Sequence, residues 1–251
     1  MNLDLPAWLP FIFFLIALIY SMVGFAGGSS YLAILILAGL PYKQVPPIAL
    51  ICNLIVSCSA FWHFYKGGYF NFRKILPFVI FSIPMAFIGG KITLSKEVFY
   101  LLLGFSLLIA GTRMLMPDKN FEEMREVSLK EIWFLGLPIG AGLGFLSGLV
   151  GIGGGIFLSP LLLFMRWVNA KEAAATASFF ILVNSFSGFL GQIQKNAIVA
   201  HQSFIFLGLA VFLGGQIGSR VGSYRLPRLT IQRITAVLIL YVSINLIGKV
   251  F

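Results

Sequence analysis

Eight apolar stretches alternate with short polar segments along the chain. Most are close to the roughly 20 residues that a helix needs to cross a bilayer. The first and the fifth are much longer, and each is interrupted by glycines. The stretches cover residues 8–40, 47–65, 75–90, 98–116, 132–165, 173–193, 203–218 and 231–248. This pattern predicts an all-α, polytopic membrane protein built as a helical bundle.

A polar linker over residues 117–131 divides the chain into two parts of similar length, and it holds five of the eight acidic residues. We therefore expect one transmembrane repeat over residues 1–116 and a second over residues 132–251. The glycine breaks support a duplication, because residues 23–28 (VGFAGG) overlay residues 150–155 (VGIGGG).

Further matches follow in the same order in the two halves, although the overlay needs a small insertion. The corresponding residues are Lys43-Gln44-Val45 with Lys171-Glu172-Ala173, Asn53 and Ser57 with Asn184 and Ser187 or Gly188, and Gly89-Gly90-Lys91 with Gly218-Ser219-Arg220. Each match alone is weak, but their common order indicates a repeat.

The positions of lysine and arginine favour one topology. If each long stretch crossed the membrane once, nine basic residues would lie on each face. If each long stretch instead forms a hairpin that returns to its starting face, thirteen lie on one face and five on the other. The thirteen are Lys66, Arg73, Lys74, Arg113, Lys119, Arg125, Lys130, Arg166, Lys171, Arg220, Arg225, Arg228 and Arg233, and the five are Lys43, Lys91, Lys96, Lys195 and Lys249.

Cytoplasmic loops carry the excess of basic residues. The hairpin model therefore predicts that the linker is cytoplasmic and that both termini are outside. Each half then contains one glycine-broken hairpin and three transmembrane helices. An odd number of crossings places the halves in opposite orientations, as two inverted repeats.

The glycine breaks are the strongest candidates for a binding site. Non-helical backbone at membrane depth is stable only where it is packed in protein or lines a cavity. A helix that restarts there presents free N–H groups and the positive end of its dipole to an anion. The alternative is that the glycines only allow close helix packing. The candidate substrate-binding residues are Gly24, Gly27, Gly28, Ser29 and Ser30 in the first half, and Gly151, Gly153, Gly154 and Gly155 in the second.

Neutral polar residues inside the next stretches could complete this site. Asn53, Ser57, Asn184 and Ser187 follow the breaks in the two halves, although ordinary hydrogen bonding between helices would also account for them. Lys91 and Arg220 end corresponding stretches. They are candidate gating residues, one at each mouth of the site, unless they only extend to the membrane surface.

Composition narrows the class of function. The chain is 59% hydrophobic and only 10% charged, against roughly 25% charged in a soluble domain. Its net charge of +10 comes from basic residues scattered between apolar stretches, so we expect no nucleic-acid partner. No acidic residue lies in the middle of a stretch, which disfavours a cation held by carboxylates.

Chemistry by a cofactor or a catalytic group has little support. Neither an HExxH motif nor a GxxxxGK[ST] loop occurs. Cys52 and Cys58 are six residues apart in one stretch, which is too far for a disulfide on a helix. We expect no metal, no cofactor, no catalytic residues and no enzymatic activity.

The second glycine break and its flanks, Gly148 to Pro160 (GLVGIGGGIFLSP), resemble the TauE/SafE family of sulfite exporters and related permeases. The first break, with Ala26 and Ser29-Ser30, is a looser copy. The resemblance covers length, duplication, linker and glycine motifs over nearly the whole chain. It implies secondary transport of sulfur-containing or related organic anions.

The sequence therefore predicts a multi-pass protein of the cell membrane that transports a small anion by alternating access around a midplane site. Sulfite, a sulfonate or a related organic acid is the expected substrate. The partners are this substrate and the lipid bilayer, with a coupling proton or ion and the oligomeric state left open. The alternative is an intramembrane enzyme or a structural membrane subunit.

Overall fold

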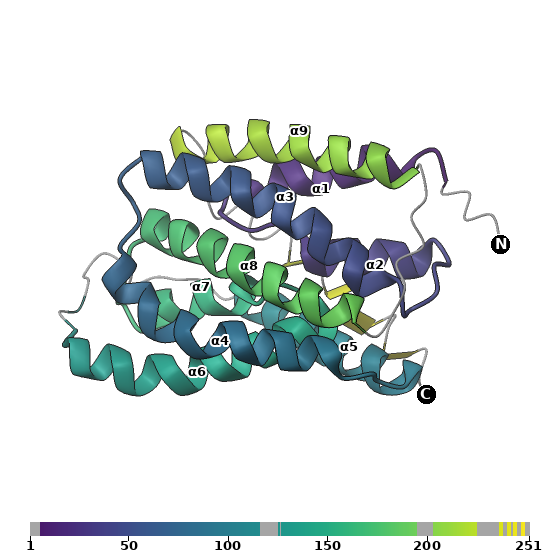
Figure 1. The fold of residues 1–251 in the computed structure, drawn as a ribbon. Helices are drawn as coiled ribbons and strands as arrows, with labels where there is room; N and C mark the ends of the chain where they lie inside the picture. The colour runs from purple at the N-terminus through teal and green to yellow at the C-terminus, as the bar shows by residue number, and fades with distance from the viewer. Residues whose placement is uncertain are drawn as a thin grey trace.

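The computed structural model describes residues 6–115, 125, 127–194 and 203–224, and isolated positions between 236 and 248. All regular structure in these parts is helical (Figure 1). The described helices are α1 (Leu9–Ser21), α2 (Gly28–Leu37), α3 (Val45–Lys66), α4 (Phe72–Lys91), α5 (Lys96–Leu115), α6 (Leu129–Val150), α7 (Gly155–Phe164), α8 (Ala170–Ile193) and α9 (Ser203–Tyr224). Most of the predicted linker 117–131 and of the stretch 231–248 lies outside the described residues.

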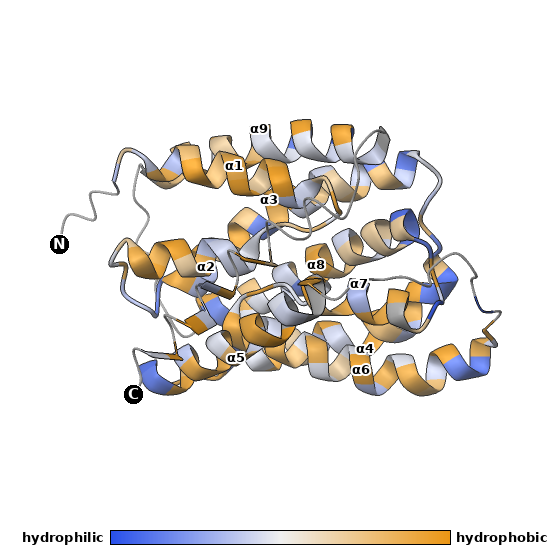
Figure 2. Cartoon of the chain, turned by 180° about the vertical axis from the view of Figure 1, so that it is seen from behind, coloured by the Kyte–Doolittle hydropathy of each residue, from blue (hydrophilic) through white to orange (hydrophobic). Residues whose placement is uncertain are grey.

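Five described helices, α3, α4, α6, α8 and α9, are long and apolar enough to cross a membrane. Large apolar side chains are exposed along the outer surface, among them Phe11, Phe134 and Ile205. Hydrophilic residues gather toward the two ends of the bundle, while apolar residues dominate the middle (Figure 2). The prediction of an all-α membrane protein is confirmed.

Local sequence explains where the helices start. The side chains of Asn71, Ser128 and Asn169 accept backbone hydrogen bonds at the starts of α4, α6 and α8, as N-cap residues do. The short helices α2 and α7 begin differently. Their N-caps, Gly27 and Gly154, are left-handed and provide no side-chain cap.

The long helices form two sets that run in opposite directions. In the first set, α1 and α9 are parallel, because Gly214, Gly218 and Gly222 of α9 face the carbonyl groups of Phe14, Leu18 and Met22 in the same order. In the second set, α4 and α6 are parallel, because Gly140, Gly144 and Gly148 of α6 face those of Phe78, Ser82 and Ala86. Helix α3 packs with α9, and α8 packs with α4.

The two sets meet where α3 packs against α8. Near one end of this interface the rings of Phe61 and Phe179 lie 5.0 Å apart, and near the other end Leu50 contacts Gly188. The residue numbers run in opposite directions along the pair, so α3 and α8 are antiparallel.

The molecule has two chemically distinct ends. We call the end at which α3 and α7 finish and α4, α6 and α8 begin the linker end. Its segments are joined by contacts, since Arg125 N–H donates to Arg166 O (3.0 Å) and Lys171 Nζ donates to Tyr69 Oη (2.9 Å). The opposite end, where α3 and α5 begin and α4 and α8 finish, is the distal end.

The pair α6–α7 is a hairpin that returns to its starting end, because Arg166 after α7 lies beside Arg125 before α6. The pair α1–α2 enters from the other end. Helix α1 is parallel to α9, and α2 leads directly into the start of α3 at the distal end. The two glycine breaks therefore connect hairpins that enter from opposite ends.

Candidate functional site

The glycine breaks occupy corresponding places in the packing. Gly24 (φ 79°) lies against the backbone of Ala174 near the start of α8. Gly151 (φ 89°) lies against Pro46 near the start of α3, where a Cβ would be 2.9 Å from the proline Cβ. A positive φ favours glycine, and the close approach excludes a side chain at both positions.

The two breaks meet at the side chain of Asn53. Its Nδ2 donates to the carbonyl oxygen of Ile152, in the second break, at 3.1 Å. A Cβ on Gly28, at the start of α2, would lie 2.7 Å from Asn53 Oδ1 and 2.8 Å from Ile152 O. Asn53 is fully buried, so one amide from α3 joins the start of α2 to the break before α7.

Ser185 of α8 reaches the same place. A Cβ on Gly153 would lie 3.1 Å from both Asn53 Nδ2 and Ser185 Oγ. Asn184 and Ser187, rather than Ser185, were predicted to bind the substrate. We call Gly28, Asn53, Ile152, Gly153 and Ser185 the central cluster.

Several buried polar atoms at and around the central cluster have no hydrogen-bond partner among the described residues. They include Asn53 Oδ1 and Ser185 Oγ, which belong to the cluster, and Ser29 Oγ, in the residue after Gly28. Ser147 Oγ is also unpaired, and its Cβ is 3.4 Å from a Cβ position on Gly154. A buried polar group without a partner costs about 1–3 kcal/mol. These hydroxyl groups and the uncapped starts of α2 and α7 are suited to donate hydrogen bonds to a ligand.

Three predicted site residues instead bond to backbone carbonyl groups. Ser57 Oγ donates to Asn53 O (2.5 Å) and Asn184 Nδ2 to Phe180 O (2.9 Å), each within its own helix. Ser187 Oγ donates to Ile83 O on α4 (2.5 Å). These bonds match the alternative of ordinary hydrogen bonding within and between helices, although Asn184 Oδ1 remains unpaired.

The packing also corrects the overlay of the two halves. Gly28 faces Asn53, whereas its counterpart Gly155 faces Ile181. The spacing from Pro46 to Asn53 equals that from Ala174 to Ile181. Asn53 therefore corresponds to Ile181, with a single inserted residue between the glycine breaks and the next helices, and its pairing with Asn184 was wrong.

Tyrosines surround the start of α2 and were not predicted. Tyr20 Oη and Ser30 Oγ share a hydrogen bond of 2.7 Å. Tyr31 stacks on Phe13 with ring centroids 4.6 Å apart, and its buried hydroxyl is unpaired among the described residues. The signal in the sequence was a tyrosine directly after Ser29-Ser30 in an otherwise apolar segment.

The two candidate gating residues lie at opposite ends of the molecule and outside the central cluster. Lys91 is exposed at the distal end, with its Nζ 4.4 Å from the centroid of the Phe87 ring. Arg220 is exposed at the linker end, next to Ser219, whose Oγ lies 3.0 Å from His63 Nδ1. Their role in gating stays a prediction.

The two ends of the α3–α8 interface are filled differently. At the linker end, Phe61, Phe70 and Phe179 pack with ring centroids 4.9–5.1 Å apart. Phe64 and Ala174 are buried beside them. At the distal end a hollow remains, with Pro46 and Gln192 among its lining residues.

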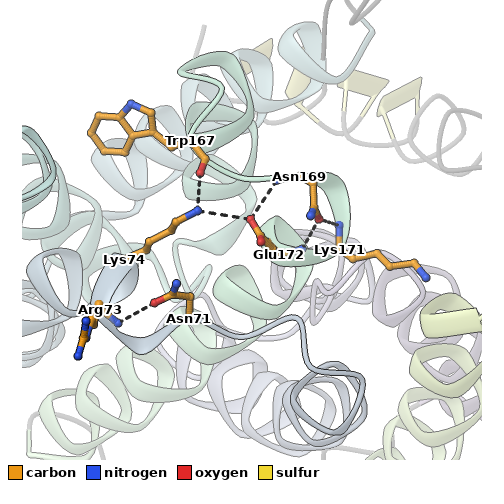
Figure 3. Close-up of polar contacts among 7 residues, drawn as sticks. All are labelled: Asn71, Arg73, Lys74, Trp167, Asn169, Lys171 and Glu172. Carbon is orange, nitrogen blue, oxygen red and sulfur yellow. Dashed lines mark hydrogen bonds and ion pairs between the residues drawn. The ribbon is translucent and has the colours of Figure 1, made fainter. Parts of the chain in front are cut away.

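Polar contacts join α4 to the segment between α7 and α8 at the linker end (Figure 3). Lys74 Nζ donates to Trp167 O (2.9 Å) and lies 3.6 Å from Glu172 Oε2. Glu172 and Asn169 form a reciprocal capping box at the start of α8.

The described residues include no group of three His, Cys, Asp or Glu side chains that could hold a metal ion. The pair Ser219–His63 does not resemble a catalytic pair. The Ser219 hydroxyl donates to Gly215 O (2.6 Å), and His63 Nδ1 is also 2.9 Å from Ser59 O.

Comparison with known proteins gives matches over nearly the whole chain. The family model described as "Sulfite exporter TauE/SafE" matches residues 9–246. The probable membrane transporter protein y4hK of Sinorhizobium fredii (strain NBRC 101917 / NGR234) is 32% identical over 94% of this chain and 95% of its own length. The probable membrane transporter protein ORF9 of Sinorhizobium sp. is 27% identical over 82% of this chain and 79% of its own. No solved structure matches.

Proposed function

This chain belongs to the sulfite exporter TauE/SafE family and is a multi-pass membrane transporter, and from that premise we propose that it carries a small anion by alternating access around the central cluster. Sulfite, a sulfonate or a related organic acid is the substrate class proposed. The family description and the chemistry of the cluster support this class.

The proposal rests on one observation. The uncapped starts of α2 and α7 both lie close to the buried side-chain amide of Asn53. The first N–H groups of α2 and α7 have no partner within their own helices, and the helix dipoles favour negative charge. Ser29 and Ser185 add hydroxyl donors. None of the described buried residues is acidic, so a cation would find no carboxylate partner at the cluster.

The packing also supports two inverted repeats. The corresponding helices α3 and α8 are antiparallel, and the hairpins α1–α2 and α6–α7 enter from opposite ends. Transporters built in this way alternate access by moving one bundle against another around a fixed site. The hollow at the distal end and the aromatic packing of Phe61, Phe70 and Phe179 at the linker end fit a conformation open toward the distal end.

Basic residues support a cytoplasmic linker end. Apart from Arg113 in α5, the described lysines and arginines number eight at the linker end and three at the distal end. The eight are Lys66, Arg73, Lys74, Arg125, Lys130, Arg166, Lys171 and Arg220, and the three are Lys43, Lys91 and Lys96. Lys91 and Arg220 would attract anions to the two mouths.

Calorimetry with a matched pair of ligands tests the function. We expect purified protein in lipid nanodiscs to bind 2-hydroxyethanesulfonate at least ~30-fold more tightly than 2-hydroxyethanesulfonamide. The uncharged ligand leaves at least two buried donors poorly satisfied, at about 1 kcal/mol or more each. Equal affinity for the two ligands would sink the proposal of an anion carrier.

A further inference from the structure

A second polar site lies outside the central cluster, at the distal end. Tyr42, Lys43, Pro46, Thr93, Leu94, Phe99, Leu149 and Gln192 line a hollow that is partly open to solvent. They come from the segment between α2 and α3, the starts of α3 and α5, the ends of α6 and α8, and the segment after α4. We call this space the distal hollow.

The charge of the distal hollow favours an anion. Its lining residues include the basic residue Lys43, the hydroxyl-bearing residues Tyr42 and Thr93, and no acidic residue. Lys91 and Lys96 lie just before and after the segment that contains Thr93, and Glu97 is the acidic residue on this side. The described charged groups nearby therefore sum to a positive value.

Gln192 requires that the ligand carry a hydrogen-bond donor. Its Nε2 donates to Gly148 O at 2.9 Å, so the amide orientation is set and Oε1 is the free atom. Gln192 is 1% exposed, and Oε1 has no partner among the described residues. An amide oxygen only accepts hydrogen bonds, so a bare anion cannot satisfy it, whereas a ligand with its own O–H or N–H group can.

The floor of the distal hollow is the second glycine break. Pro46 lines the hollow and packs against Gly151. Leu149 lines it two residues before Gly151, and Gln192 holds the carbonyl group of Gly148. A ligand in the hollow is thus separated from the central cluster by the backbone that leads to Ile152 and Gly153.

The central cluster repeats the same combination of groups. Asn53 Nδ2 is used by Ile152 O, and Asn53 Oδ1 is an unpaired, fully buried acceptor. Hydroxyl groups of Ser29 and Ser185 lie around it. Both places therefore offer donors for an anionic group together with one amide oxygen for a donor.

We propose that the distal hollow is an outer binding site that captures a small monoanion carrying an O–H or N–H group before it passes to the central cluster. Lys43 binds the anionic group, and Gln192 Oε1 accepts the hydrogen bond from the ligand. This inference rests on the proposed function, and it adds a second site and a requirement for a donor on the substrate.

Two sulfonates that differ by one hydroxyl group test the requirement. Calorimetry on the wild-type protein in nanodiscs compares 2-hydroxyethanesulfonate with ethanesulfonate. The hydroxylated ligand should bind at least about fivefold more tightly, which is the lower bound for satisfying a buried acceptor. Equal affinities would overturn the proposal without any variant.

Three variants locate the preference in the distal hollow. Gln192→Met should reduce the preference, leaving only the part due to Asn53 Oδ1 in the central cluster, and should leave the binding of ethanesulfonate within about twofold of the wild type. Lys43→Gln should weaken both ligands and reduce the salt dependence of binding. Lys130→Gln, an exposed lysine at the linker end, is the matched control and should change neither. A preference in Gln192→Met as large as in the wild type, or affinities unchanged in Lys43→Gln, would overturn the outer site.

The experiment separates the two proposals. If the wild-type protein binds neither sulfonate and transports no small anion, the proposed function fails. If it binds the sulfonates but the variants of the distal hollow behave like the wild type, only the outer site fails.

Discussion

Position 28 requires glycine because there is no room for a side chain, and not because of its backbone conformation. The residue has no positive φ, yet a Cβ there would be 2.8 Å from Ile152 O and in collision with the amide of Asn53. We predict that Gly28→Ala weakens anion binding at least tenfold and destabilises the fold by about 1–3 kcal/mol, as overpacking does. Calorimetry and thermal unfolding measure the two effects.

Gly142 of α6 provides the matched control for Gly28. A Cβ at this position meets no heavy atom within 4 Å. Gly142→Ala should therefore bind anions like the wild type and gain up to about 1 kcal/mol of stability from the better helix propensity of alanine. The prediction is wrong if Gly28→Ala binds as tightly as Gly142→Ala.

Larger substitutions at the other glycines would not separate ligand space from folding. Gly27 and Gly154 have φ angles of 92° and 75°, where a leucine is strained whether or not a ligand lies beside it. A loss of transport in such variants would mix two causes. Gly28 is the better probe because its requirement is only steric.

The sequence could predict the glycines of the site but not all of its polar side chains. Consecutive residues on a helix point about 100° apart, so Ser185 faces the central cluster while Asn184 and Ser187 bond elsewhere. This rotation is set by how α8 packs on α3. A run of serine and asparagine in one apolar helix does not show which of these side chains faces the central cluster.

At the level of the helices, Lys74 and Glu172 connect α4 to the segment between α7 and α8. Lys74 Nζ bonds Trp167 O and lies 3.6 Å from Glu172 Oε2 (Figure 3). Both side chains are about a quarter exposed. A double-mutant cycle with Lys74→Met and Glu172→Gln should therefore give a coupling of about 0.2–1 kcal/mol, because partial exposure screens the pair.

Glu172→Gln tests the charge of Glu172 separately from its role at the start of α8. Glutamine can keep the capping box with Asn169, so Glu172→Gln removes the ion pair and leaves the start of α8 intact. Lys74→Met also loses the bond to Trp167 O and should lower the melting temperature more. Strictly additive effects in thermal unfolding would show that the two side chains do not interact.

Hydrophobicity predicted the existence of the spanning helices but not their partners. Helix α4 of the first half packs on α6 of the second, and α9 of the second half packs on α1 of the first. Inside a bilayer, apolar faces do not distinguish protein from lipid. The partners are chosen by rows of glycine at four-residue spacing, Gly140-Gly144-Gly148 and Gly214-Gly218-Gly222, which let the backbones approach. Those rows were visible in the sequence, but not the helices that they face.

For the whole molecule, the unequal charge of the two ends predicts its orientation in the membrane. Eight described basic residues at the linker end against three at the distal end predict that the linker end is cytoplasmic. Single cysteines at Lys91 and at Lys130 mark the two ends, and both positions are exposed. The background carries Cys58→Ser, because Cys58 is exposed, whereas Cys52 is buried and can remain.

In intact cells, a membrane-impermeant maleimide should label Lys91→Cys and leave Lys130→Cys unlabelled until the membrane is opened. The background protein with Cys58→Ser alone is the control and should remain unlabelled before and after opening. The reverse pattern would place the distal hollow in the cytoplasm, and the anion would then be captured from inside the cell. Labelling of both cysteines from the same side would contradict the packing itself, because α4 and α6 run in parallel and carry Lys91 and Lys130 at opposite ends.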